Sequence, residues 1–265
     1  EGRGAGRPPP FLGMFEWPRK LPAKRRAAMN RGGEQTANLW VEFLTDKAKS
    51  LYDKKFSEKR FLDALCDCAK ATNAYKDDIF LYTCLFPEYI ALQHTNLQSD
   101  NAYYWYNDKD EMDTGLIDWG GASPGPFAAR LSGSITSALG EVLDEHEEGF
   151  LRCFINEYYR ECGIWLDYGE LHRQWMLNYC CYINSMGSNI EMEIFRETPR
   201  TMWKNIKDKW DDKAAGRWNV RCYVFMIDHA LEYLYRRWKK NGERRLHCHD
   251  IFEEWKDYWE GSGMT

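Results

Sequence analysis

The chain lacks an apolar run long enough to cross a membrane as a helix. Such a helix needs roughly 18–20 consecutive apolar residues. The densest apolar stretch runs from Tyr223 to Leu234. Three polar residues, Asp228, His229 and Glu232, interrupt it. The sequence therefore predicts no membrane span.

The chain also lacks an excess of basic residues. It has 36 Lys and Arg against 41 Asp and Glu, for a net charge of −5. A protein that binds nucleic acid through phosphate contacts usually carries the opposite balance, so we expect no nucleic-acid partner. With 44% hydrophobic and 29% charged residues in 265, the composition is that of a globular protein with one large domain or two small ones.

The cysteines show neither the spacing of a disulfide framework nor that of a zinc motif. Most of the nine lie among apolar neighbours, so we expect buried, reduced thiols and an intracellular, reducing compartment. The adjacent pair Cys180-Cys181 is expected to pack rather than to do redox chemistry. One further cluster, His247-Cys248-His249, resembles a metal motif. Adjacent side chains point in different directions, however, and no partner pair lies at ligand spacing, so we predict no zinc site there. The cysteines are Cys66, Cys68, Cys84, Cys153, Cys162, Cys180, Cys181, Cys222 and Cys248.

The first 33 residues differ in composition from the rest. They open with the Gly/Pro/Arg-rich run EGRGAGRPPP and carry basic residues between Arg19 and Arg26. We interpret residues 1–33 as a basic arm or linker and residues 34–265 as the folded domain. The arm could be left by processing or could be the edge of a longer precursor, and removal of an organellar targeting segment is a further possibility.

Helical periodicity covers most of the folded part. Apolar residues recur at three- and four-residue steps from Gln35 to Lys55, and Ser57 is a candidate cap for a second helix. A third helix is expected at Asp77–Phe86, before Pro87. Gly163 and Gly187 are candidate C-caps. Later helices are expected near 127–139, 141–162, 167–187, 190–210, 217–240 and 249–260.

Short aromatic and β-branched runs interrupt the helices. Ala102–Tyr106 and Thr114–Ile117 flank a turn-like Asn107–Asp110 and predict a hairpin, and Glu88–Gln93 predicts one more strand. Gly120–Pro126 is expected to be a loop. The fold class predicted from these patterns is mainly α with a small β-hairpin.

Two short motifs flank the predicted hairpin. His94-Thr95-Asn96-Leu97-Gln98-Ser99-Asp100-Asn101 precedes it, and Leu116-Ile117-Asp118-Trp119 ends it. In order and spacing they resemble the carboxyl-terminal lobe of the aminoglycoside phosphotransferase and choline kinase-like family, a branch of the protein-kinase-like fold. That family has His-Gly-Asp-Leu-His-x-x-Asn, then a hairpin, then Ile-Asp-Trp or Ile-Asp-Phe. The resemblance covers roughly residues 35–240 and implies a kinase-like carboxyl-terminal lobe.

The resemblance assigns roles to particular residues. In phosphoryl transfer a protein mainly positions groups and neutralises charge. By resemblance, Asn101 and Asp118 would hold Mg²⁺ against nucleotide phosphates, and His94 would brace the loop. Taken alone, Asp118 could instead cap a turn after a strand.

The departures from the family pattern bear on activity. Asn96 stands in the place of the family's catalytic Asp and cannot act as a base near pH 7. Thr95 replaces the usual Gly, and Gln98 replaces a frequent second His. Asp100 lies beside the loop, but its position along the loop points it away from the reaction centre.

The family's amino-terminal nucleotide lobe has no counterpart in the 34 residues before the helical region. The glycines of EGRGAGR run directly into three prolines, and Lys20 and Lys24 have no strand around them, so they do not form a phosphate-covering loop and a strand Lys. Either this lobe was lost, or it lies upstream of Glu1.

Two functions remain open from the sequence. The first is a catalytically degenerate phosphotransferase-like domain, a pseudokinase with no required cofactor, which binds or scaffolds proteins in a larger assembly. The alternative is part of an active small-molecule kinase that uses Mg and ATP on a hydroxyl substrate. The last third is rich in tryptophan, which could pack the core or form a docking surface. The residues in question are Trp203, Trp210, Trp218, Trp238, Trp255 and Trp259.

Overall fold

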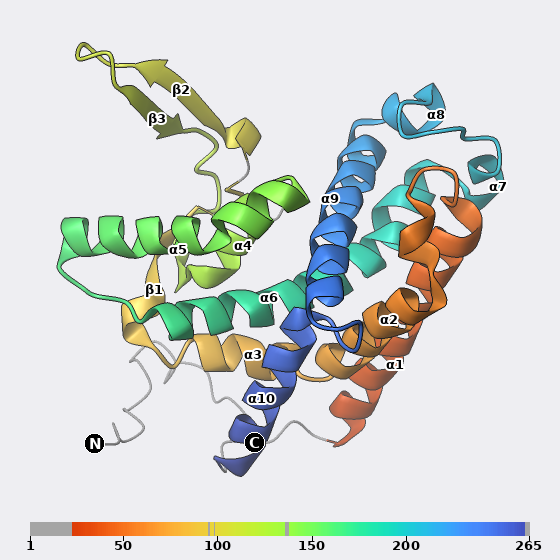
Figure 1. The fold of residues 1–265 in the computed structure, drawn as a ribbon, viewed down its shortest axis with the longest axis horizontal. Coiled ribbons are helices and arrows are strands. Elements are labelled where there is room, and N and C mark those ends of the chain that lie inside the picture. Colours follow the sequence, from red (N-terminus) through yellow and green to blue (C-terminus); the bar gives the residue numbers. More distant parts are fainter. Residues whose placement is uncertain (1–22, 95, 98, 136–137, 263–265) are drawn as a thin grey trace.

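A computed structural model describes residues 23–94, 96–97, 99–135 and 138–262. This part of the chain is mainly helical and carries two small antiparallel sheets, one of which is the expected hairpin (Figure 1). The prediction of a mainly α protein with a small hairpin is confirmed. Within these residues, no helix is long and apolar enough to cross a membrane.

The elements follow one another as helices, then strands, then helices again. The α-helices are α1 (Ala23–Glu42), α2 (Lys59–Asn73), α3 (Lys76–Thr83), α4 (Ala128–Ile135), α5 (Gly140–Cys162), α6 (Tyr168–Asn189), α7 (Arg200–Trp203), α8 (Asp212–Ala215), α9 (Trp218–Lys240) and α10 (His247–Gly261). The strands are β1 (Ile90–Gln93), β2 (Ala102–Tyr106), β3 (Met112–Leu116) and β4 (Ser123–Pro126). Short π-helices, η2 (Phe43–Lys47) and η6 (Ile190–Phe195), continue α1 and α6.

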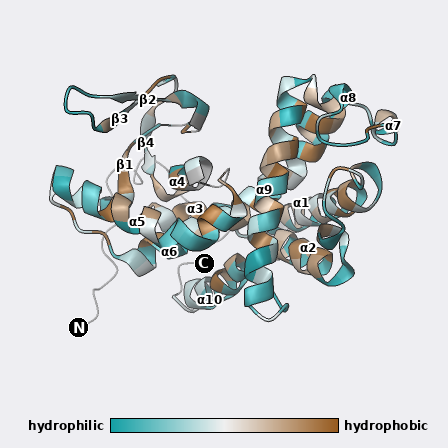
Figure 2. Ribbon diagram, turned by 45° about the horizontal axis from the view of Figure 1, so that its top comes forward, coloured by the Kyte–Doolittle hydropathy of each residue, from teal (hydrophilic) through white to brown (hydrophobic). Residues whose placement is uncertain are grey.

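Helix α6 is the centre of the core. It contacts α1, α2, α4, α5 and α10, and to a lesser extent α3 and α9. The side chains it buries include Trp175, Tyr179 and Cys180. In Figure 2 most helices carry both hydrophilic and hydrophobic stretches, as expected for amphipathic helices around one core. Four of the six late tryptophans (Trp203, Trp238, Trp255 and Trp259) belong to this core, while Trp210 and Trp218 are exposed.

Helix α1 begins twelve residues before the predicted Gln35. Residues 23–33 are therefore helical, and the boundary placed after residue 33 was wrong. The reason lies in packing: the Arg26 guanidinium lies over the Tyr75 ring at 4.5 Å and pairs with Asp78 at 3.6 Å, and Met29 is buried. The remainder of the predicted arm, residues 1–22, lies outside the described residues.

Of the two candidate glycine caps, one is confirmed. Gly163 follows α5 with φ 72° and donates its N–H to Tyr159 O at 2.8 Å. Gly187 was wrongly predicted as a cap, because α6 runs past it to Asn189. Its role is close packing: a Cβ at this position would lie 2.4 Å from Thr36 Cγ2 and 2.6 Å from Trp40 Nε1 on α1.

Other predicted boundaries also changed. Ser57 does not cap α2, because it sits in a 3₁₀ turn (Lys54–Ser57) and its hydroxyl donates to Lys54 O. The helix expected at 190–210 is broken into η6 and α7, with Pro199 between them. The loop expected at Gly120–Pro126 contains strand β4, paired with β1. Pro124 and Pro126 are two residues apart, so their missing N–H groups lie on the same side of strand β4. The N–H groups of Ser123 and Gly125 lie on the other side.

Candidate functional site

The two small sheets hold the motif loop between them. Strand β1 pairs with β4, with Gln93 opposite Ser123, and β2 pairs with β3, with Ala102 opposite Leu116. The loop from β1 to β2 and the segment from β3 to β4 therefore both run between the same two paired strand ends, Gln93–Ser123 and Ala102–Leu116. The sheets thus bring residues 94–101 next to residues 117–122.

His94 braces this arrangement. Its side chain is buried, and Nε2 lies 2.7 Å from the Ile117 carbonyl oxygen. The Asn96 backbone N–H donates to Nδ1 at 3.3 Å. Because Nδ1 accepts this bond, Nε2 carries the proton and donates to the Ile117 carbonyl oxygen. The ring also packs edge-on against Trp119 at 4.8 Å.

Asn101 ties the end of the loop to its beginning. Its side-chain Nδ2 donates to the backbone carbonyl oxygen of Asn96 at 2.7 Å, and its backbone carbonyl oxygen accepts from the Ile117 N–H at 2.9 Å. The Asn101 side chain is largely buried. Nδ2 is engaged in this bond, and Oδ1 is the acceptor atom of the same amide.

Asn96, which the resemblance would place at the position of a catalytic base, is exposed. Its backbone is held at both polar groups, by His94 and by Asn101. Two hydrogen bonds therefore fix the backbone at residue 96, and its side chain is a neutral carboxamide. A carboxamide can orient a hydroxyl group but does not take its proton.

Asp118 follows Ile117, the residue whose backbone joins His94 to Asn101. It is exposed and has φ 60°, in the left-handed region that Asp tolerates better than most residues. In the described part of the chain, Asp118 does not belong to any group of three His, Cys, Asp or Glu side chains that lie close enough together to share an ion. The resemblance would make the Asp118 carboxylate and the Asn101 amide oxygen the protein ligands of a cation. Water and phosphate oxygens would complete the shell, as is usual for Mg²⁺.

The charge of Asp100 acts on a residue of helix α9. Burial raises the pKa of the Cys222 thiol on α9, Arg221 opposes that shift, and the Asp100 charge adds to it. Thr95 and Gln98, the other two departures from the family pattern, lie outside the described residues.

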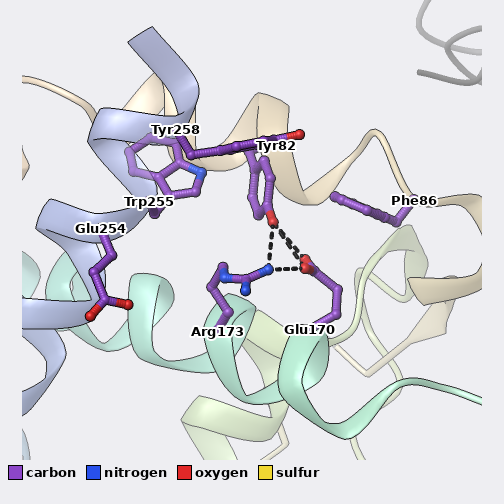
Figure 3. Close-up of a pocket in the computed structure, with 7 residues that line it drawn as sticks. All are labelled: Tyr82, Phe86, Glu170, Arg173, Glu254, Trp255 and Tyr258. Carbon is purple, nitrogen blue, oxygen red and sulfur yellow. Dashed lines mark hydrogen bonds and ion pairs between the residues drawn. The ribbon is translucent and has the colours of Figure 1, made fainter. Parts of the chain in front are cut away.

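A second candidate site, which no sequence pattern indicated, is a cleft of about 470 Å³ between α3, α6 and α10 (Figure 3). Its centre is the Glu170 carboxylate, which accepts hydrogen bonds from Tyr82 Oη at 2.9 and 3.0 Å and from Arg173 Nη1 at 2.5 Å. Gln174 donates to the same carboxylate at 3.0 Å. The lining residues are Tyr82, Phe86, Glu170, Arg173, Glu254, Trp255 and Tyr258.

Burial shifts the pKa of both central groups of this cleft. Burial raises the pKa of Glu170, against the hydrogen bonds from Gln174 and Tyr82 and the charge of Arg173. Burial, followed by the charge of Glu170, raises the pKa of the Tyr82 hydroxyl. Both Glu170 oxygens are engaged, so the cleft offers aromatic faces and an ion pair. Its residues come from three helices far apart in the sequence, and Glu170 and Arg173 look like an ordinary helical i, i+3 pair.

Comparisons of the chain with protein-family models, with curated proteins and with solved structures found no match. The kinase-like interpretation therefore rests on the order of the motifs and on the local geometry of the loop.

Proposed function

We propose that this chain is a catalytically degenerate, kinase-like phosphotransferase domain that acts by binding protein partners within a larger assembly. The observation that carries the proposal is the hydrogen-bonded loop: Asn101 Nδ2 holds the Asn96 carbonyl at 2.7 Å while His94 ties the loop to Ile117. These hydrogen bonds hold His94, Asn96 and Asn101 against Ile117, and the residue that the resemblance places at the base position is neutral.

On this proposal, the lack of a general base accounts for the loss of catalytic activity. General-base catalysis typically contributes 10²–10⁴-fold to a rate. The Asn96 carboxamide cannot supply it. Positioning by Asn101 and Asp118 does not replace proton acceptance, so binding is the property that the site can retain.

Exposed aromatic residues on the hairpin support a protein partner. Tyr103 and Trp105 stack at 5.2 Å with an interplanar angle of 23°, and both are more than a third exposed. The hairpin projects away from the helices (Figure 1). Aromatic side chains of this kind are favoured at interface hot spots. Other large, exposed apolar residues on or beside the hairpin are Leu92, Tyr104, Tyr106, Met112, Ile117 and Trp119.

Phosphotransfer assays test the absence of catalysis. We expect the purified chain to transfer no phosphate from Mg·ATP to a panel of small alcohols and amines. Activity that disappears in Asp118→Ala, but persists in a matched Asp108→Ala variant at the exposed hairpin turn, would overturn the proposal. A rise in the thermal midpoint with Mg·ATP, absent in Asp118→Ala, would show that nucleotide binding has been kept without turnover.

Photo-cross-linking tests the partner surface. A photoreactive residue in place of Tyr104 should form a defined adduct with a protein in extracts of the source cells, and the double variant Tyr103→Ala/Trp105→Ala should weaken it at least tenfold. The same photoreactive residue in place of Tyr159, which is exposed on α5, serves as the control. Equal labelling from both positions contradicts a specific hairpin partner.

A second candidate is part of an active small-molecule kinase whose nucleotide lobe lies upstream of Glu1. The exposed Leu92, Ile117 and Trp119 beside the motif loop favour it, because an adjoining lobe would cover them. The test is the gene sequence upstream of Glu1. A strand-rich segment with a Gly-rich loop and a strand Lys, and Mg·ATP-dependent transfer by the longer chain, would replace the first proposal with this one.

A further inference from the structure

Three cysteine thiols meet inside the helical core. Cys68 on α2, Cys180 on α6 and Cys248 on α10 have Sγ atoms that all lie within 4.8 Å of one another. The Cys68 and Cys180 sulfurs are 4.0 Å apart, and the Cys180 thiol donates to the Cys248 carbonyl oxygen at 3.3 Å. The three residues are 0–1% exposed. All nine cysteines of the chain are free thiols.

This convergence separates the cluster from the other buried thiols. A single buried cysteine commonly packs as a small apolar side chain, and Cys66 and Cys84 are examples. Cys68, Cys180 and Cys248 come from three different helices, at separations of 112 and 68 residues. Among the described residues, this is the group in which three potential His, Cys, Asp or Glu ligands face a common point.

The sulfur separations match those of a metal thiolate. With metal–sulfur bonds of about 2.3 Å, three sulfurs around an ion in their plane lie about 4.0 Å apart, and two tetrahedral ligands lie about 3.8 Å apart. The Cys68–Cys180 distance already has this value. Cys248 has to approach by less than about 1 Å to complete the triangle, since no pair exceeds 4.8 Å.

We propose that Cys68, Cys180 and Cys248 form a binding site for a soft, thiophilic metal ion, monovalent copper. Soft thiolate ligands select Cu⁺ and Zn²⁺, and structural Zn²⁺ sites take four protein ligands. In the described part of the chain no fourth His, Cys, Asp or Glu joins the three sulfurs, and the enclosed position leaves no route for solvent to act as a ligand. Cu⁺ accepts three thiolates in a plane, so it fits the number and the shape of the ligands.

Binding would replace three S–H bonds by three Cu–S bonds and release the thiol protons, without change of oxidation state. The resulting site carries excess negative charge in the core. His247 and His249 flank Cys248 on the first turn of α10, and His249 is buried and lies 3.4 Å from Glu253. The metal would fasten α10 to α2 and α6, and it would enter while α10 docks, before the core closes.

Metal analysis of the wild-type chain tests the site directly. The chain is refolded anaerobically with a reductant and Cu⁺, passed over a desalting column and analysed for bound copper and by X-ray absorption. We expect one copper per chain, three sulfur neighbours at about 2.3 Å, and a higher thermal midpoint than the metal-free chain. Because the folded core encloses the site, a Cu⁺ chelator should remove the ion slowly under native conditions and quickly in denaturant.

Variants assign the ligands. Cys248→Ala and Cys68→Ala should each lose at least 90% of the bound copper and the metal-dependent rise in the thermal midpoint. Cys84→Ala, which removes a buried thiol outside the cluster, should keep both. Absence of copper from the wild-type chain, equal loss in Cys84→Ala, or preferential uptake of Zn²⁺ over Cu⁺ would overturn the proposal. The absorption spectrum of the wild-type chain decides the outcome even if a cluster variant fails to fold.

Discussion

At the scale of single residues, the motif loop depends on a few polar side chains with defined hydrogen-bond roles. His94 is buried, accepts at Nδ1 from Asn96 and donates at Nε2 to Ile117. Asn101 makes the complementary connection from the other end of the loop. Each of these groups has its partner inside the protein, so loss of one leaves a buried polar atom without a partner.

His94→Ala is therefore expected to lower the free energy of unfolding by about 2–3 kcal/mol, through a lost hydrogen bond, an unsatisfied Ile117 carbonyl and a cavity beside Trp119. Urea unfolding followed by tryptophan fluorescence measures this. His146→Ala is the matched control, because His146 is more than half exposed on α5. A loss below about 0.5 kcal/mol for His94→Ala, within the usual effect of a surface substitution, would contradict the brace role.

At the scale of elements, a glycine in one helix can let a second helix pack directly against its backbone. Gly187 lies inside α6 and faces Thr36 and Trp40 of α1, at a contact where a Cβ has no room. Gly149 lies inside α5, and nothing would lie within 4 Å of its Cβ. Glycine therefore allows close helix packing at position 187 in α6, whereas at position 149 it only lowers the stability of α5.

Gly187→Ala is expected to destabilise the protein by about 1–3 kcal/mol, because the added methyl group clashes with the indole of Trp40. Gly149→Ala should instead stabilise it by about 0.5–1 kcal/mol through helix propensity. Thermal and urea unfolding of both variants measures the two effects. Stabilisation by both substitutions would show that α1 can move away from α6 at little cost.

At the scale of the whole molecule, buried charge links helices that are distant in the sequence. Glu147 on α5 accepts from Tyr233 Oη at 2.5 Å and from Arg237 Nη1 and Nη2 at 3.0 and 2.8 Å, both on α9. His172 on α6 lies 3.4 Å from the same carboxylate. Burial opposes the charge of Glu147, but hydrogen bonds from His172 and Tyr233 and the charge of Arg237 outweigh it and lower its pKa.

A carboxyl group whose pKa is lowered by folding stabilises the protein above its unfolded-state pKa, and this contribution disappears as the pH falls through the folded-state value. Glu147→Gln should therefore lower the free energy of unfolding by about 2 kcal/mol at pH 7. The difference from wild type should shrink as the pH falls below about 4.5. Urea unfolding between pH 7 and pH 3 measures it.

The exposed neighbour Glu145 provides the control, since Glu145→Gln should change stability little at any pH. A Glu147→Gln deficit that stays constant down to pH 3 would show that packing, and not ionisation, is what Glu147 contributes.

Much of the fold follows from local pattern. The hairpin, the helical character of both halves and the Gly163 cap were predictable, because apolar periodicity and turn residues act over a few neighbours. The boundaries of α1 and α6 were not. Arg26 and Gly187 have local surroundings typical of an arm and of a helix end, and contacts with Tyr75 and Trp40 override them.

The order of residues alone establishes which side chains are available: Asn96 where the resemblance would place a base, Asn101 and Asp118 at fixed spacing, and nine cysteines without a motif. Tertiary structure alone decided which of these groups meet. Sheet pairing brings the loop 94–101 to Ile117, and the docking of α10 brings Cys248 to Cys68 and Cys180. Local interactions set residue type and helix period over a few positions, whereas contacts across 68 to 112 residues arise only from burial of a shared core.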